Sequence, residues 1–353
     1  MNGNYYGFEL LEEEVQILKE LEKLLNIPIP RARQQDNETF GFMTKNSNVC
    51  SLTIYDRQLE SLPENFGNLG QLEYLSLQVN YISQLPSSFS SLKNLKTLNI
   101  SFNGFREFPN EILSLENLET LILTGNRIQE LPVEIKKLPN LKILIASDMR
   151  LKKIPDEIGD LIKLEKINFS NNEIESIPEA MKYLKNLKSL EINENKLKNI
   201  PEVLETLRHL EVLKCSKNEL LSLPSSIGDF EELKTLDVSF NALESIPEYL
   251  YWNKMTDLNL SNNKLQKLPE SLGKLTELRT FYLNGNHLRR LPLSTYKLEN
   301  LEELNVKDNI IDRLPDKIEH LENLKILDIQ GNKLPRSMKI TDLLKAKGVQ
   351  VVI

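Results

Sequence analysis

The feature that most constrains this chain is an internal repeat of twenty-three residues. It is clearest in residues 118–140, which read LETLILTGNRIQELPVEIKKLPN. The same spacing of apolar residues, asparagine and proline occurs in residues 95–117 and again in residues 164–186. A period of this length indicates a solenoid, in which each repeat buries its apolar side chains only by stacking on its neighbours.

Thirteen repeats follow this pattern over residues 49–334, the last of them truncated. A chain of 353 residues would ordinarily divide into two or three globular domains, but a solenoid carries one core through all its repeats. We therefore predict one array, with residues 1–48 and 335–353 as its ends. The repeats begin at Val49, Leu72, Leu95, Leu118, Leu141, Leu164, Leu187, Leu210, Leu233, Met255, Leu278, Leu301 and Leu324.

Each repeat begins with a short alternating stretch, such as Leu121-Ile122-Leu123 between two threonines. Alternation with a period of two is typical of a strand that buries one face. The asparagine that follows can pair with backbone groups at the turn, and the proline fixes the return segment. The pattern predicts an α/β solenoid: a curved array with a parallel concave sheet, one face of which is open, and short irregular or helical convex segments.

The N-terminal end departs from the repeat. We expect a loose tail over residues 1–7, then an amphipathic helix over residues 8–25 that ends at Pro28 and Pro30, and a hairpin over residues 39–54. The helix and hairpin would cover the apolar end of the first repeat. As an alternative, the apolar face of the helix binds a partner helix.

The C-terminal end also departs from the repeat. We expect a short helix over residues 340–347, whose start is capped by Thr341 or Ser337 and whose end is Gly348. Residues 349–353 are expected to add an edge strand. Together these elements would form a C-terminal cap.

Composition narrows the class of protein. The net charge of −7 combines 44 basic and 51 acidic residues that are well mixed, which argues against a nucleic-acid partner. The start of the chain lacks the features of a signal peptide, and no stretch is apolar enough to span a membrane. The two cysteines, Cys50 and Cys215, lie too many repeats apart for a disulfide. We therefore expect a reduced, cytoplasmic protein.

The motif LxxLxLxxNxLxxLPxxIxxLxx, repeated over residues 49–334, resembles that of intracellular leucine-rich repeat proteins of the twenty-three-residue class. Within that class the chain is similar to the Ras-suppressor group and to prokaryotic relatives built almost wholly of repeats. The resemblance implies a curved solenoid that acts as a protein-protein interaction scaffold. It also implies a small GTPase, or a regulator of one, as a class of partner.

The sequence carries no recognisable catalytic or metal-binding motif. Among the three histidines, His209, His287 and His320, none has an acid or a nucleophile at a matching spacing. No zinc-protease, phosphate-loop, dinucleotide-binding or calcium-loop pattern occurs. Cys215 occupies an inward strand position and is predicted to be a core residue, whereas Cys50 would be an exposed thiol. We expect a monomer with no enzyme activity, no cofactor and no metal site.

Function is expected on the outward side chains of the strands, where folding does not require apolar residues. The N-terminal repeats nevertheless place an apolar group there, and such a patch with aromatic residues is typical of a protein interface. Two alternatives stay open: the N-terminus of the chain covers the patch, or the patch has no role. The candidate partner-binding residues are Tyr55, Tyr74, Val79, Phe102, Ile122, Ile143 and Ile145.

A second class of function is a receptor or sensor for a non-protein ligand, such as a glycan or a lipid. A glycan site favours aromatic stacking platforms with a polar rim, and Tyr55 with Tyr74 is the one candidate pair. An enzyme would need a cluster of groups that linear spacing hides.

Three further features stand out. Met149 stands where asparagine belongs, with Ala146 at a large inward position, which predicts a local distortion in which Asp148 supplies the missing acceptor. Trp252 lies in a repeat that is one residue short and is expected to fill the space of a leucine. The second residue of successive repeats alternates between glutamate and lysine over residues 73–234, which predicts a ladder of opposite charges.

Overall fold

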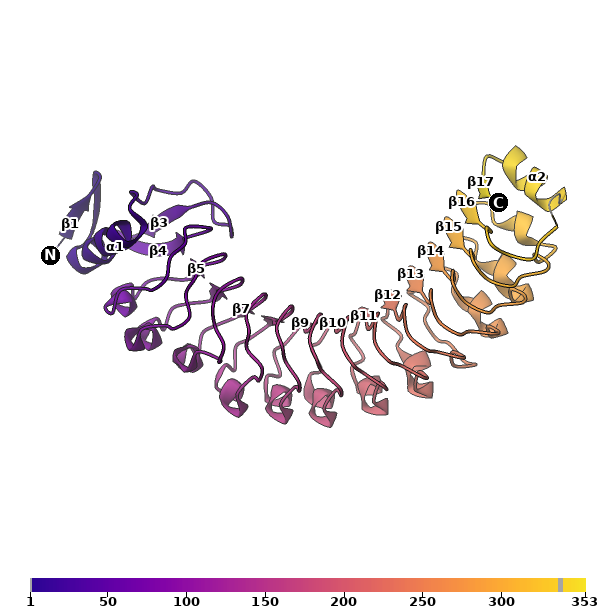
Figure 1. Cartoon of the computed structure of the whole chain (residues 1–353), viewed down its shortest axis with the longest axis horizontal. Coiled ribbons are helices and arrows are strands. Elements are labelled where there is room, and N and C mark those ends of the chain that lie inside the picture. The colour runs from indigo at the N-terminus through magenta and orange to yellow at the C-terminus, as the bar shows by residue number, and fades with distance from the viewer. Residues whose placement is uncertain (1, 336–338) are drawn as a thin grey trace. The chain divides into compact units, whose positions relative to one another are not determined.

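The computed structural model describes residues 2–335 and 339–353. The chain divides into two compact halves, an N-terminal half (Met1–Glu173) and a C-terminal half (Ile174–Ile353). Within each half the strands line one face and short 3-10 helices lie on the opposite side (Figure 1). The predicted α/β solenoid with a parallel sheet is therefore confirmed in both halves.

The N-terminal half begins with elements outside the repeat. Strand β1 (Asn2–Tyr5) pairs antiparallel with β2 (Phe8–Leu11), helix α1 (Glu12–Leu25) follows directly, and β3 (Gly41–Lys45) pairs antiparallel with β4 (Asn48–Thr53). From β4 onward, neighbouring strands of this half are parallel. These strands are β5 (Tyr74–Ser76), β6 (Thr97–Asn99), β7 (Thr120–Ile122), β8 (Ile143–Ile145) and β9 (Lys166–Asn168).

The C-terminal half continues the same pattern with parallel strands. Its last helix is α2 (Lys339–Ala346), and the edge strand β17 (Gln350–Val352) pairs parallel with β16. The other strands are β10 (Ser189–Glu191), β11 (Val212–Lys214), β12 (Thr235–Asp237), β13 (Asp257–Asn259), β14 (Thr280–Tyr282), β15 (Glu303–Asn305) and β16 (Ile326–Asp328).

The return segments of the repeats carry 3-10 helices, and a proline at the N-cap opens most of them. Pro132, for example, has φ −71° and precedes the helix Val133–Lys137. The fixed φ of proline suits this position, and its missing N–H removes a donor that a single turn could not satisfy. The other 3-10 helices are Phe66–Asn68, Ser87–Ser91, Asn110–Ser114, Asp156–Asp160, Glu179–Tyr183, Glu202–Thr206, Ser225–Asp229, Glu270–Lys274, Leu293–Lys297 and Ile318–His320.

The core of each half follows the alternation of the strands. Leu121 and Leu123 are fully buried, while Ile122 between them is half-buried on the open face. A row of asparagines then closes the turns. In Asn103 the amide Nδ2 donates to the carbonyl of Leu77, 2.9 Å away in the preceding repeat, while Oδ1 accepts from the Ile82 N–H at 3.0 Å. The asparagines therefore satisfy backbone groups that the turns leave unpaired and join successive repeats.

The structure corrects the prediction for the first residues of the chain. We expected a loose tail followed by a helix from residue 8, but β1 and β2 form a hairpin and the helix begins at Glu12. The hairpin is held because Tyr5 is buried and its hydroxyl donates to the Glu22 carboxylate of α1, 2.7 Å away. The hairpin that we predict over residues 39–54 is present as β3 and β4.

Helix α1 contacts the first repeat through Glu14, which is 1% exposed. Both carboxylate oxygens lie within hydrogen-bond distance of the Val49 N–H in β4, at 3.1 and 3.2 Å. Burial raises the pKa of Glu14 to about 7, although the hydrogen bonds from Val49 and Leu11 act in the opposite direction. This contact suits the capping role that we predict for residues 1–48.

The prediction of a local distortion at Met149 is wrong for the sheet, because β7, β8 and β9 pair without a shift in register. Met149 is buried in place of the asparagine. Asp148 does not take over the asparagine's role; its Oδ1 accepts from Asn171 Nδ2 of the next repeat at 2.8 Å. The change is confined to the turn, where the Arg150 N–H lies 3.3 Å from the Ile128 carbonyl.

The prediction that Trp252 fills the place of a leucine in the short repeat is confirmed. The indole is fully buried, and its Nε1 donates to the carbonyl of Ile227 at 2.6 Å. The Trp252 carbonyl accepts from the Met255 N–H, as the Leu138 carbonyl accepts from the Leu141 N–H. Tryptophan therefore occupies the place of the leucine, and its larger ring compensates for the missing residue.

The C-terminal predictions hold closely. Helix α2 lies within one residue of the expected span, and Gly348 ends it with φ +88°, a left-handed conformation that glycine adopts without strain. Thr341 does not cap the start of this helix as predicted, because it is the third residue inside it and is buried. The other proposed cap, Ser337, lies outside the described residues.

Candidate functional site

Strand register brings three of the predicted binding residues together on the open face of the N-terminal half. Ile122 in β7 pairs directly with Ile145 in β8, and Ile143 lies two residues earlier on the same strand. All three side chains are half-buried and point away from the core. We call these three residues the isoleucine patch.

The isoleucine patch replaces a polar row. The register places Asn99 beside Ile122 and Asn168 beside Ile145, so the two isoleucines stand between two asparagines. In each flanking repeat the asparagine Oδ1 accepts a hydrogen bond from a serine N–H two residues further on, at 3.0 Å in β6 and 2.9 Å in β9. An isoleucine cannot accept that bond. The patch therefore gives up a local stabilising contact in two neighbouring repeats.

Two more of the predicted residues lie at a turn position where the backbone has positive φ. The eighth position of each repeat turns out of the strand with positive φ, a conformation that Gly125 adopts without a steric penalty. Val79 and Phe102 hold the same conformation, with φ of +59° and +52°. For a β-branched or bulky side chain this conformation is strained. Phe240 in the C-terminal half holds it as well, with φ +52°, so the conformation follows from the repeat.

Phe102 lies at the border of the isoleucine patch. Its ring covers Gly125 so closely that a Cβ on that glycine would stand 2.3 Å from Phe102 Cδ1. Phe102 is nevertheless 48% exposed. The ring therefore packs against Gly125, where there is no room for a side chain, and it is still open to solvent on its other side.

A loop before β3 covers the other side of the open face. Asn37 Oδ1 accepts from the Tyr74 hydroxyl at 2.8 Å and from Asn99 Nδ2 at 3.0 Å, and the Asn37 carbonyl accepts from Ser76 Oγ at 3.2 Å. The carbonyl of Asp36 accepts from Thr53 Oγ1 at 2.9 Å. Residues 34–40, which we call the N-terminal loop, therefore lie over β4, β5 and β6.

This loop changes the status of Tyr74. The side chain is 7% exposed, and burial together with the charge of Asp36 raises its pKa to about 12. For Tyr74 the structure thus agrees with the alternative that the N-terminus of the chain covers the patch. Tyr55 and Val79 remain half-exposed, but they lie at strand ends and not in the isoleucine patch. Asn37 escaped prediction because no periodicity connects residues 37, 74 and 99.

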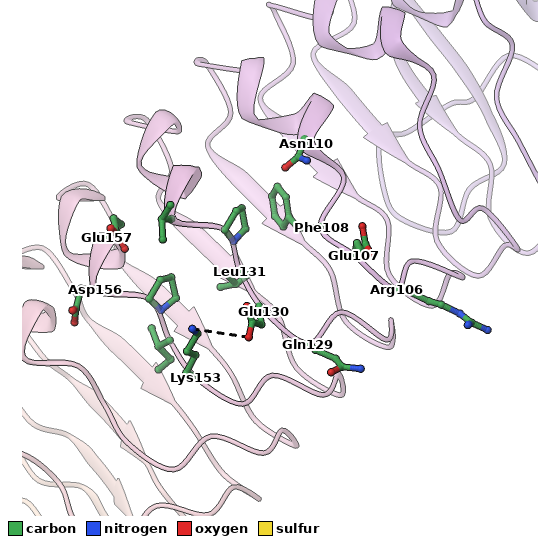
Figure 2. Close-up of a pocket in the computed structure, with 14 residues that line it drawn as sticks. Arg106, Glu107, Phe108, Asn110, Gln129, Glu130, Leu131, Lys153, Asp156 and Glu157 are labelled. Carbon is green, nitrogen blue, oxygen red and sulfur yellow. Dashed lines mark ion pairs between the residues drawn. The ribbon is translucent and has the colours of Figure 1, made fainter.

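A groove of about 840 Å³ follows the return segments of the same half. Its apolar part comes from the residue before proline in successive repeats, namely Phe108 and Leu131 (Figure 2) and also Ile154. Its rim is charged, and Lys153 Nζ lies 4.0 Å from Glu130 Oε1. Because the motif itself generates these positions in every repeat, the groove is a consequence of the architecture.

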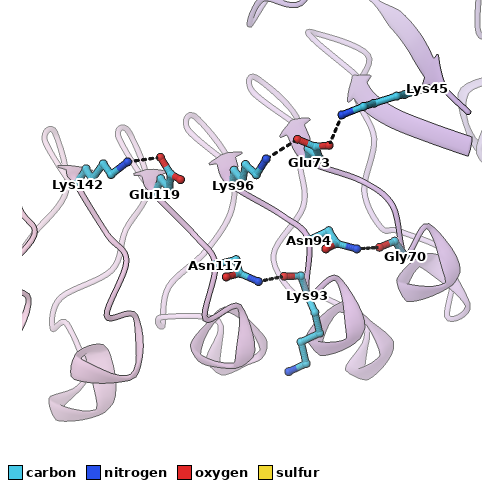
Figure 3. A network of polar contacts seen from close by, with 9 residues as sticks. All are labelled: Lys45, Gly70, Glu73, Lys93, Asn94, Lys96, Asn117, Glu119 and Lys142. Atoms are coloured by element: carbon cyan, nitrogen blue, oxygen red, sulfur yellow. Dashed lines mark hydrogen bonds and ion pairs between the residues drawn. The ribbon is translucent and has the colours of Figure 1, made fainter.

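The predicted charge ladder is present along the strand starts. Lys96 Nζ lies 2.7 Å from Glu73 Oε2, and Lys142 Nζ lies 2.7 Å from Glu119 Oε2 (Figure 3). Lys45 of β3 extends the ladder to Glu73. Hydrogen bonds from Lys96 and then Lys45 hold the pKa of Glu73 below its usual range.

Figure 3 also shows a second asparagine row that the sequence analysis did not anticipate. The last residue of a repeat reaches back to the carbonyl of the preceding return segment. Asn94 Nδ2 donates to Gly70 at 2.7 Å, and Asn117 Nδ2 donates to Lys93 at 2.9 Å. Such bonds fix the 3-10 side of the solenoid as the first asparagine row fixes the strand side.

Two family models match parts of the chain. One, described as a leucine-rich repeat region, matches residues 94–199, and the other, described as a leucine rich repeat, matches residues 231–288. This is a leucine-rich repeat protein. Leucine-rich repeat proteins generally act as protein-interaction scaffolds, and the repeat matches fall in both halves of the chain.

Solved structures agree with this assignment. A leucine-rich repeat protein of Leptospira interrogans is 29% identical, with 84% of this chain and 82% of that chain covered and a TM-score of 0.72. An internalin of Listeria monocytogenes shares the fold at 19% identity, with coverage of 87% and 89% and a TM-score of 0.76.

A third solved structure has a bound partner in its description. It is the leucine-rich repeat ectodomain of the plant membrane receptor kinase GASSHO1/SCHENGEN3 from Arabidopsis thaliana, in complex with Casparian strip integrity factor 2. The leucine-rich repeat protein described here matches it at 25% identity over 90% of its own length and 50% of that chain, with a TM-score of 0.63. A comparison with curated proteins found no match.

No feature of the described part of the chain indicates catalysis. Within the described ranges, no three histidine, cysteine, aspartate or glutamate side chains converge to hold a metal ion, and no helix is long and apolar enough to cross a membrane.

Cys215 is fully buried, and burial raises the pKa of its thiol. Cys50, expected to be exposed, is half-buried with a raised pKa, mainly because of burial, and its Sγ donates to the Met43 carbonyl at 3.6 Å. A high pKa keeps both thiols in the unreactive protonated form at neutral pH.

Proposed function

We propose that this leucine-rich repeat protein is a non-catalytic scaffold that binds a protein partner through the isoleucine patch. The observation that carries the proposal is the replacement of two asparagines by Ile122 and Ile145 on an open sheet face. The flanking asparagines make local hydrogen bonds, so folding alone would favour asparagine there. An apolar cluster that folding does not require is typical of the centre of an interface.

The surroundings of the patch suit a protein surface. Phe102 supplies an exposed aromatic ring at the border, and aromatic side chains are frequent anchors of interfaces. Thr124 Oγ1 and Ser147 Oγ, 3.0 Å apart, and the half-buried Lys166 add a polar rim. The N-terminal loop would form the edge of the same surface.

The class of partner rests on resemblance. Similarity to the Ras-suppressor group supports a small GTPase or its regulator, which would be met in the cytoplasm by a monomeric scaffold. The glycan or lipid alternative is supported less well, because its aromatic platform needed Tyr74. That ring is buried, and its hydroxyl is bonded to Asn37.

The test is a pull-down from lysate that compares the wild type with Ile122→Asp plus Ile145→Asp. A matched control is Val133→Asp plus Leu221→Asp, which changes two exposed apolar residues, 51% and 65% exposed, away from the isoleucine patch. We expect the patch variant to lose partners that the control retains, with both variants folded by circular dichroism. Recovery of the same proteins by the patch variant would contradict the proposal. Direct titration with a purified small GTPase, in its GDP and GTP forms, then tests the partner class separately.

A further inference from the structure

A second candidate binding site lies in the N-terminal cap. It is a cavity of about 490 Å³, within the range of small-molecule sites, and its walls are almost wholly aromatic and apolar. The walls come from the β1–β2 hairpin, from the segment after α1 and from the chain that enters β3. The side chains that line it include Tyr5, Tyr6, Phe8, Arg31, Phe40 and Phe42.

The floor of this cavity is held in place by contacts from several directions. Glu22 accepts hydrogen bonds from the Tyr5 hydroxyl at 2.7 Å and from the Ile29 N–H at 2.9 Å, so one carboxylate fixes two walls. The Phe42 N–H donates to the Pro30 carbonyl at 3.0 Å. The rings of Tyr5 and Phe42 meet edge to face with centroids 5.4 Å apart. The cavity is therefore preformed, which lowers the cost of binding a ligand.

One wall carries an exposed aromatic ring, Tyr6, which meets the buried Tyr5 ring edge to face with centroids 4.9 Å apart. Tyr6 occupies the hairpin turn with φ +47°, a conformation that asparagine or glycine adopts at lower cost, and its side chain is 68% exposed. The turn is closed without the ring, because Asn4 Oδ1 accepts from the Gly7 N–H at 2.9 Å. An exposed aromatic residue in a strained position beside an apolar cavity suggests a role in binding.

Arg31 is the one charged residue among the described residues that line the cavity. The guanidinium carbon of Arg31 lies 4.9 Å from the centroid of the Phe8 ring, so the ring holds the charge over the cavity wall. Arg31 is exposed, and none of the ion pairs found among the described residues involves it. A guanidinium beside an apolar cavity is complementary to a carboxylate whose remaining body is apolar.

We propose that this cavity binds a small free carboxylic acid with an aryl or medium-chain acyl body. The apolar body lies between Tyr6, Phe8 and Phe40, and the carboxylate accepts hydrogen bonds from the guanidinium of Arg31. This site is separate from the isoleucine patch and does not depend on the function proposed for it.

The test uses three probes of equal chain length, namely decanoate, decanol and decyltrimethylammonium, titrated by calorimetry with the full chain. The two ionic probes are kept below their critical micelle concentrations and decanol below its solubility limit. We expect decanoate to bind more tightly than decanol by about fivefold and the cation to bind most weakly. Arg31→Gln should remove the preference for decanoate over decanol, whereas Arg31→Lys should keep most of it. Arg33→Gln is the matched control, because that arginine is exposed nearby but does not line the cavity, and it should change nothing.

A second variant separates binding from folding. Tyr6→Asn suits the left-handed turn, so the unfolding midpoint should stay equal or rise, while affinity for both decanoate and decanol should fall. The proposal is overturned if decanoate does not bind, if Arg31→Gln leaves its preference intact, or if a peptide ending in an apolar carboxylate binds while the free acids do not.

Discussion

The open faces of the two halves occupy the same positions of the same repeat but carry different chemistry. In the N-terminal half, β7 and β8 present Ile122, Ile143 and Ile145. In the C-terminal half the corresponding positions are polar throughout β12 and β13, with Asp237 at the end of one strand and Asn259 at the end of the next. The architecture therefore tolerates both kinds of face.

The polar side chains at the ends of β12 and β13 accept hydrogen bonds from residues that follow them in the same repeat. Asp237 Oδ1 accepts from the N–H of Ser239 at 3.0 Å and from its hydroxyl at 2.7 Å, and Asn259 makes the same pair of bonds to Ser261 at 3.1 and 2.7 Å. These bonds stabilise the turn that leaves each strand. The isoleucines supply no such bond, and we therefore propose partner binding for the isoleucine patch, in contrast to turn stabilisation by the polar residues of β12 and β13.

The largest effect on the free energy of unfolding is expected from a substitution in the core of a strand, and a much smaller one from a substitution on its open face. Leu144→Ala should lower the free energy of unfolding by about 2–5 kcal/mol, because it leaves a cavity between two repeats. Ile145→Asn, one residue along, should change it by less than about 1 kcal/mol or raise it, because asparagine restores the bond that Asn168 makes in the next repeat. Denaturant unfolding followed by circular dichroism measures both. A cost for Ile145→Asn as large as that for Leu144→Ala would mean that the patch serves folding.

This contrast also shows what could be predicted from the sequence. A fixed period of twenty-three residues places Ile122 beside Ile145 before any coordinates are known, because equal positions of successive repeats must pair. It likewise identifies the inward leucines and the asparagine row. The same reasoning found Trp252 in the core, since a missing residue in a stacked array must be compensated by volume.

The N-terminal cap could not be predicted in the same way. Tyr74 looked accessible because its repeat position is outward, yet Asn37 covers it from a segment that has no period. The β1–β2 hairpin was missed because its residues were too few to show alternation. At Met149 the pattern overstated the damage, because one lost amide contact is small beside the strand pairing on both sides.

A second, smaller effect is expected in the dependence of stability on pH, where one glutamate in each half should act in the opposite direction from the other. Burial raises the pKa of Glu14 to about 7, so its carboxyl destabilises the folded state once it ionises. The folded chain binds more protons than the unfolded chain between pH about 4.5 and about 7, and stability falls as pH rises through this window. Glu14→Gln should remove that fall and be more stable than the wild type at pH 8, by up to about 3 kcal/mol.

The matched control is Glu270→Gln in the C-terminal half. Burial alone would raise the pKa of Glu270, but hydrogen bonds from Ser294 and from the Leu293 N–H outweigh it, and the pKa is lowered. Its contribution is present at neutral pH and is lost as pH falls below the ordinary range of a glutamate. Unfolding at a series of pH values checks both variants. Parallel pH profiles for the two would contradict the assignment.

The smallest effect should come from the charge ladder, which both halves share. Lys142→Glu in the N-terminal half and Lys234→Glu in the C-terminal half each replace an attraction, to Glu119 and Glu211 respectively, with a repulsion. Because these pairs are exposed, each reversal should lower stability by no more than about 1 kcal/mol at low salt and by nothing measurable at high salt.

The double variant Glu119→Lys plus Lys142→Glu restores opposite signs within the pair, but it places like charges beside Lys96 and Glu165 of the neighbouring repeats. It should therefore recover only part of the loss. A slip by one repeat would bring like charges together, glutamate beside glutamate or lysine beside lysine. We therefore propose that the ladder acts mainly against misregister and only weakly on the stability of the correct pairing. The measurable consequence is a lower yield of refolded chain for the single reversals at low salt. If refolding yield and unfolding midpoint are both unchanged at low salt, the ladder has no part in setting the register, and the sheet relies on its leucines and asparagines alone.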